Sequence, residues 1–156
     1  MVIYIGADHQ GFNLKEEIKP FLQNQLYEIE DVTPEFKEGD DYPDVASAVA
    51  KKVRYNLDNS RGIIICSNGV GVNIVANKFD KIRCALGFSS DQIFDARNDD
   101  NVNVLALPAS FVDSETAKKI VEVFLQTKFA DHEDRFKRRI SKILEIERNR
   151  EGAVDN

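Results

Sequence analysis

Apolar and polar positions along the chain follow two alternating patterns. Short runs rich in β-branched residues predict strands at residues 2–5, 27–32, 62–66, 82–86 and 102–107. Apolar residues at three- and four-residue spacings predict helices at residues 12–26, 44–57, 72–78, 90–99, 114–128 and 133–148. Pro20 falls inside the first helix and predicts a kink or a new turn there. We expect Asp44 to be the N-cap of the second helix.

This order of elements predicts the fold class. Strands that alternate with helices form right-handed crossover units and a parallel sheet. We therefore expect an α/β protein, a single-domain three-layer α/β/α sandwich with a five-stranded parallel Rossmann-like sheet plus a C-terminal helix. The domain is expected to span residues 1–150, and residues 151–156 are expected to form a disordered tail.

The last predicted helix has an apolar stripe whose packing partner the preceding elements do not define. Phe136, Ile140, Ile143 and Leu144 share one face of it and basic residues surround them. The stripe comes after the five-stranded sandwich is complete, so either a partner subunit or the helix's own domain covers it.

Composition narrows the function classes. The 156 residues are 42 % hydrophobic and carry a net charge of −6, which fits a globular domain and disfavours nucleic acid as a partner. No apolar run approaches the roughly 18 residues needed for a membrane span, and the N-terminus resembles a strand rather than a signal peptide. We expect a cytoplasmic protein with no membrane partner, in which Cys66 and Cys84 stay reduced.

Candidate catalytic or binding residues follow two of the predicted strands. Asp8, His9, Gln10 and Gly11 follow the first strand, either as part of a site or as a simple helix cap. The segment 66–71, Cys-Ser-Asn-Gly-Val-Gly, follows the third strand. Its glycines admit a ligand to the backbone, and the helix start beyond it favours anions and a thiolate. The alternative is a buried structural cysteine.

Charged clusters lie outside those two loops. Asp99 and Asp100 could bind a metal, but no histidine stands near them in the sequence, so solvated carboxylates are the preferred interpretation. Arg135 and Arg139 share one helix face and could grip a phosphate, or form a solvated basic face.

In order and spacing, these segments resemble the ribose-5-phosphate isomerase B family, the RpiB/LacA/LacB sugar-phosphate isomerases. The matching motifs are Gly-Ala-Asp-His-Gln-Gly-Phe at 6–12, Asp-Tyr-Pro-Asp at 41–44, the strand and loop at 62–71, Ala-Asn-Lys at 76–78 and the helix at 135–143. The resemblance covers residues 2–143. It implies an aldose–ketose isomerase that works through an enediol without a metal or an organic cofactor, with a small sugar phosphate as its ligand.

The resemblance also implies roles for individual residues. Cys66 is the general base, Asn68 takes the place of a loop threonine, and Asp99 takes the place of a ring-opening histidine. The expected substrate-binding residues are Asp8, His9, Tyr42, Ser67, Gly69, Val70, Gly71, Asp100, Arg135 and Arg139. In the family the sites lie across a subunit interface, which implies a homodimer or a dimer of dimers.

Several positions depart from the family pattern. Asp99 and Asp100 replace a histidine and an asparagine, Ser110 replaces a phosphate-binding arginine, and Phe136 replaces a histidine. Three hypotheses follow. The chain is a ribose-5-phosphate isomerase, an isomerase of another sugar or sugar phosphate such as galactose 6-phosphate, or a non-catalytic sugar-phosphate-binding subunit paired with a complete paralogue.

Overall fold

The computed structural model describes residues 1–152. Five parallel strands form its sheet, in the order β2-β1-β3-β5-β4. Their bounds are β1 (Val2–Ala7), β2 (Glu28–Asp31), β3 (Ser60–Cys66), β4 (Cys84–Leu86) and β5 (Val104–Pro108). The predicted five-stranded parallel sheet is confirmed.

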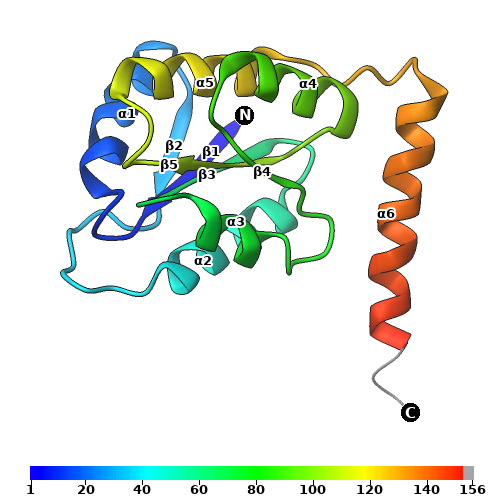
Figure 1. The fold of residues 1–156 in the computed structure, drawn as a ribbon, viewed down its shortest axis with the longest axis horizontal. Coiled ribbons are helices and arrows are strands. Elements are labelled where there is room, and N and C mark those ends of the chain that lie inside the picture. Colours follow the sequence, from blue (N-terminus) through cyan, green and yellow to red (C-terminus); the bar gives the residue numbers. More distant parts are fainter. Residues whose placement is uncertain (153–156) are drawn as a thin grey trace.

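Helices cover both faces of the sheet (Figure 1). One face carries α1 (Phe12–Asn24), α4 (Ser90–Asp100) and α5 (Ser114–Gln126), and the other carries α2 (Tyr42–Tyr55) and α3 (Val70–Ala76). The predicted three-layer sandwich is therefore confirmed. Among the described residues, no helix is both long and apolar enough to cross a membrane.

The core consists of two apolar layers separated by the sheet. Because side chains alternate along a strand, Ile63 and Ile65 of β3 pack under α1 and α5. Ile64 and Cys66 pack on the other side, against α2 and α3. This alternation places Cys66 at the carboxyl end of the central strand, on the face covered by the glycine loop and α3.

Two local predictions are wrong. Asp44 lies in the first turn of α2, and the N-cap is Asp41, in an extended conformation. β4 begins at Cys84 rather than at residue 82. α1 continues through Pro20, and the kink expected there stays a prediction.

The predicted domain boundary at residue 150 stays a prediction. α6 (Asp134–Gly152) continues through residues 151 and 152, and the rest of the predicted tail, residues 153–156, lies outside the described residues.

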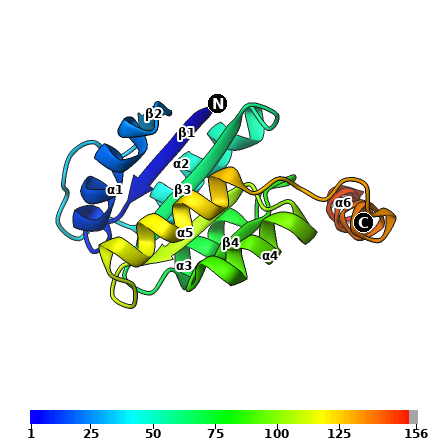
Figure 2. The ribbon, with the colours of Figure 1, turned by 90° about the horizontal axis from the view of Figure 1, so that it is seen from above.

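α6 stands beyond the β4 edge of the sheet (Figures 1 and 2). Its first turn is anchored because Phe136 is only 2 % exposed. Further along, the carboxylate of Glu147 accepts the Lys81 backbone N–H at 3.0 Å. Ile143 and Ile146 remain 36 % and 63 % exposed, beside a cavity of about 430 Å³ between α6 and β4. The helix's own domain therefore covers only part of its apolar surface.

Candidate active site

A cavity of about 460 Å³ opens at the carboxyl ends of β1 and β3, a size typical of ligand sites. In an open parallel sheet this is where ligands bind. Its lining residues are Asp8, His9, Gln10, Asp40, Tyr42, Cys66, Ser67, Asn68, Val70, Gly71 and Ile74. The structure thus gathers eight of the sequence-predicted site residues in one place.

The glycine loop wraps closely around Cys66. The Sγ atom of Cys66 accepts the backbone N–H of Gly69 at 3.2 Å, and its side chain is almost fully buried. Gly69 has φ +73°, and a Cβ there would lie 2.4 Å from a methyl group of Leu86. Only glycine fits both demands. Gly69 is buried behind the cavity rather than lining it, so its contribution is the shape of the loop and its N–H group.

The neighbouring amide groups of the loop differ in their hydrogen bonding. Val70 donates its N–H to Oδ1 of Asn68 at 3.0 Å. Within the described residues, no backbone hydrogen bond uses the N–H groups of Asn68 and Gly71. Unsatisfied donors at a helix start are suited to an oxygen that gains negative charge.

The loop after β1 is held against the end of β3. A Cβ on Gly11 would lie 2.5 Å from the carbonyl oxygen of Ile65, so the two backbones meet there without room for a side chain. Asp8 donates its N–H to the same carbonyl at 3.2 Å. Asp8 and Cys66 therefore come to one cavity from neighbouring strands.

Asp8 combines a turn-closing contact with a place in the cavity. Its Oδ1 accepts the N–H groups of Gln10 at 3.0 Å and Gly11 at 2.9 Å. Burial raises the pKa of Asp8, and those two hydrogen bonds oppose the rise. The helix-cap interpretation is therefore wrong: Asp8 closes the turn before α1, whose N-cap is Gly11 without a side-chain hydrogen bond, and Asp8 also lines the cavity.

Tyr42 closes one wall of the cavity. It is the first residue of α2, and its ring lies on Gly71, where a Cβ would meet the ring carbons at 2.6 Å. The ring remains 41 % exposed, so its hydroxyl is within reach of a ligand. On the opposite side, the hydroxyl groups of Ser67 and Ser110 lie 2.9 Å apart, which links the loops after β3 and β5.

The cavity is acidic for an anion site. Asp8 and Asp40 line it, and no lysine or arginine of the described residues does. His9 is the one lining side chain that can carry a positive charge at neutral pH, and hydrogen bonding to Asp40 raises its pKa.

Four predicted site residues lie elsewhere, and their roles stay predictions. Asp99 and Asp100 end α4, just before β5 begins, whereas Cys66 pairs with the last residue of β5. The two aspartates and Cys66 therefore lie at opposite ends of β5, and a strand of this length spans roughly 13 Å. Arg135 and Arg139 are exposed on α6, beyond the edge of the sheet (Figure 2).

Sequence reasoning missed Asp40 and Ile74, and it named Gln10 in the candidate loop without giving it a role. Gln10 and Ile74 adjoin predicted residues, so the two loops could have indicated them. Asp40 had no such signal, because it lies in a polar loop and its contact is with His9, 31 residues away. No cluster of three or more metal-ligating side chains occurs within residues 1–152.

Comparison with known proteins places these features in a family. Residues 3–143 match the Ribose/Galactose Isomerase family. A relative named as a probable ribose-5-phosphate isomerase B of Mycoplasma genitalium is 41 % identical over 150 residues, 96 % of this chain and 97 % of the relative. The solved structure of ribose-5-phosphate isomerase B from Clostridium thermocellum matches with a TM-score of 0.90 at 39 % identity, over 96 % of this chain and 99 % of that one.

A second solved structure contains a ligand. It is ribose-5-phosphate isomerase B from Mycoplasma genitalium with bound ribulose-5-phosphate, with a TM-score of 0.89 and 41 % identity over 94 % of this chain and 96 % of that one. Sequence and structure agree over nearly the whole chain, and the chain belongs to the Ribose/Galactose Isomerase family.

Proposed function

We propose that this chain is an aldose–ketose isomerase that interconverts ribose 5-phosphate and ribulose 5-phosphate. The observation that carries the proposal is the cavity that brings the buried Cys66 thiol, the glycine loop, Asp8 and Tyr42 together. The related structure with bound ribulose-5-phosphate supports the choice of substrate.

The reaction needs one base and one set of hydrogen-bond donors. In the open-chain aldose, the Cys66 thiolate removes the proton from C2, and the electron pair moves onto the C1 carbonyl oxygen. The N–H groups of Asn68 and Gly71 donate to the oxygen that becomes negative. In this enediolate the O2 proton passes to O1, and C1 receives the proton from the Cys66 thiol as the C2–O2 bond becomes the carbonyl of the ketose.

The remaining groups would come from a second copy of the chain. Asp99, Asp100, Arg135 and Arg139 lie at the β4 edge and on α6, where Ile143 and Ile146 are exposed. A homodimer that buries this edge against the cavity of its partner would supply both arginines for the phosphate and a carboxylate for ring opening. The proposed site is therefore shared between subunits.

A second candidate function has its own supporting observation. The cavity contains two carboxylates and no lysine or arginine of the described residues, and Ser110 stands where the family has a phosphate-binding arginine. Carboxylates suit sugar hydroxyls better than a phosphate dianion. Another sugar phosphate or an unphosphorylated sugar is therefore the alternative substrate.

Turnover of a substrate panel by the purified protein tests both candidates. We expect turnover of ribose 5-phosphate, and faster turnover of a six-carbon phosphate or an unphosphorylated sugar would favour the alternative. In the same assay, Cys66→Ala should lower kcat by at least about a thousandfold, because it removes the proposed general base. Substrate binding should change little. Full activity of Cys66→Ala would exclude Cys66 as the base.

Cys84 provides the matched control. It is the other cysteine of the chain and lies in β4, where burial raises the pKa of its thiol well above the usual range. Cys84→Ala should keep its activity and lose up to about 1 kcal/mol of stability. A wild-type protein that binds ribulose 5-phosphate but turns over no member of the panel would support the non-catalytic subunit instead.

A further inference from the structure

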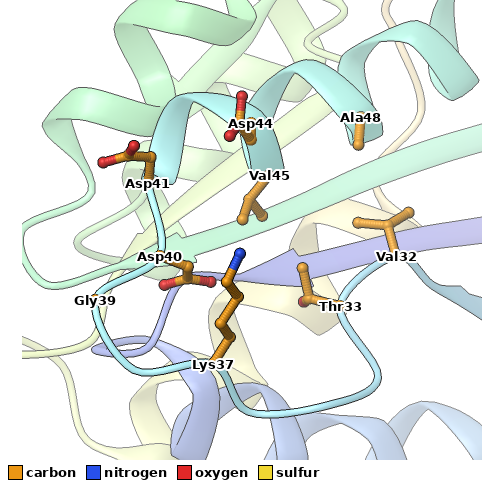
Figure 3. Close-up of a pocket in the computed structure, with 9 residues that line it drawn as sticks. All are labelled: Val32, Thr33, Lys37, Gly39, Asp40, Asp41, Asp44, Val45 and Ala48. Atoms are coloured by element: carbon orange, nitrogen blue, oxygen red, sulfur yellow. The ribbon is translucent and has the colours of Figure 1, made fainter.

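Asp40 forms part of the wall between the active-site cavity and a neighbouring cavity of about 300 Å³. Figure 3 shows the second cavity, with Lys37 extending into it between Asp40 and Thr33. Asp41 and Asp44, at the start of α2, also line it. Asp40 is the one residue common to both cavities.

Asp40 contacts His9 at two points through the same oxygen. Its Oδ1 accepts the backbone N–H of His9 at 2.7 Å and lies 3.0 Å from the ring Nδ1. A carboxylate accepts hydrogen bonds, so Nδ1 carries a proton. Within the described residues, Asp40 has no ion pair with Lys37, and His9 is its ion-pair partner.

These contacts determine the orientation of the His9 imidazole ring and which of its nitrogens is available to a ligand. With Nδ1 turned to Asp40, Nε2 is the ring nitrogen left for a ligand, and no hydrogen bond among the described residues uses it. A second-sphere carboxylate that fixes one ring nitrogen also fixes the orientation of the other. The backbone contact holds the loop residue itself in place.

The charges around His9 all favour the imidazolium. Asp40 is first among them, followed by Asp8 on the adjoining loop and Glu38 on the loop that carries Asp40. His9 itself is exposed enough to reach a ligand, with 26 % of its side chain accessible. It is the only lining side chain of the described cavity residues that can be cationic at neutral pH.

We propose that Asp40 is a positioning residue that holds the His9 imidazolium with Nε2–H directed at the phosphate of the substrate. The inference rests on the proposed function, since it assigns a phosphate to the ligand. By favouring the protonated ring, Asp40 preserves the positive charge of His9 in a cavity whose other charged lining groups are acidic. Binding of a dianion should weaken as pH rises and His9 loses its proton.

The direct test follows the histidine signals by NMR in the wild type and in Asp40→Asn. The chain has two histidines, and His132→Gln assigns the signal of His9. In Asp40→Asn the pKa of His9 should fall toward its ordinary value of about 6.5. Sulfate, a dianion at every pH between 6 and 9, is the binding probe, and its affinity at pH 7.5 should fall roughly fivefold.

Asp44→Asn is the matched control. It removes the same charge from the same neighbouring cavity but does not contact His9. Its His9 titration and sulfate affinity should equal those of the wild type. In kinetics with ribose 5-phosphate, Asp40→Asn should raise KM by a similar roughly fivefold factor and change kcat less.

Two results would overturn the proposal. One is an unchanged His9 titration in Asp40→Asn. The other is an unchanged sulfate affinity with a lower kcat, which would assign the pair to proton transfer instead. Because the titration and the sulfate measurement need no turnover, they remain decisive even if no sugar phosphate proves to be a substrate.

Discussion

Two glycines of this chain share a left-handed backbone but differ in their surroundings. Gly69, in the loop around Cys66, has φ +73° and no room for a side chain because Leu86 lies 2.4 Å from the position of a Cβ. Gly39, in the loop before α2, has φ +66° and nothing within 4 Å of that position. A methyl group therefore costs backbone strain at both sites but a steric clash at only one.

This difference predicts the effects of two alanine substitutions. Gly39→Ala should cost about 1 kcal/mol, the price of a left-handed alanine. Gly69→Ala should cost roughly 2–3 kcal/mol, since Leu86 or the loop must move as well. It should also lower kcat, because the N–H of Gly69 contacts Cys66 Sγ. Chemical denaturation and initial rates measure both effects, and equal losses at the two glycines would contradict the steric argument.

At this scale the sequence predicted residues whose partners are close along the chain. Cys66 and Gly69 share one loop, and Asp8 bonds to residues two and three positions ahead. Asp40 was missed because its partner lies 31 residues away. Its position depends on the path of an irregular loop, which no periodicity encodes.

At the scale of elements, a buried lysine ties α1 to β2. Lys15 is fully buried, and its Nζ lies 2.8 Å from Oδ2 of Asp31 and 4.3 Å from the ring centre of Phe12. The same Nζ donates to the carbonyl of Thr33. Thr33 in turn accepts the N–H of Ala7, the residue before Asp8, at 2.9 Å. The network therefore fixes the start of the loop that carries Asp40.

Acid stability tests this network. Burial raises the pKa of Asp31, but hydrogen bonds from Lys15, Lys19 and the Thr33 N–H outweigh it, so the net shift is downward. A lowered pKa contributes stability above the ordinary value of about 4, and that stability is lost as pH falls through the folded-state pKa. Lys15→Met should cost about 3 kcal/mol at pH 7 and progressively less in acid.

Lys19→Met is the control, because Lys19 also lies 2.8 Å from Asp31 but is partly exposed. It should cost under about 1 kcal/mol. Urea denaturation of both variants at pH 7 and at about pH 2.5, below the ordinary pKa of a carboxyl group, gives the comparison. A loss for Lys15→Met that is the same at both pH values would mean that packing, not charge, is what the lysine provides.

Element order was predictable from the sequence, but some element ends were not. The helix α2 starts at Tyr42 rather than at Asp44 because Pro43, with its fixed φ, fits the first helical turn. β4 is short because the side chain of Asn103 accepts the N–H of Arg83 at 2.8 Å, in place of a strand partner. Such side-chain contacts across the fold are invisible to a pattern of apolar positions.

At the scale of the whole molecule, the predicted site residues fall into two groups. Asp8, His9, Tyr42 and Cys66 meet at the carboxyl ends of the strands. Asp99 and Asp100 lie at the other end of β5, and Arg135 and Arg139 lie on α6, which stands clear of the sheet (Figure 1). The resemblance to the family implied a site shared between subunits, and the fold shows how far apart the two groups lie within one chain.

Mixing two inactive variants tests whether two chains complete each other's sites. Cys66→Ala lacks the proposed base, and the double variant Arg135→Ala/Arg139→Ala lacks the proposed phosphate contacts. Each alone should be nearly inactive. After unfolding and refolding an equal mixture, half of the dimers are hybrids, and each hybrid has one of its two sites intact, so about a quarter of the wild-type activity should return. Cys66→Ala mixed with a triple variant that also carries Cys66→Ala should recover none, because every possible site then lacks the thiol. No recovery in the first mixture, although its chains form dimers, would place both arginines outside the shared site and leave the phosphate to groups of the same chain.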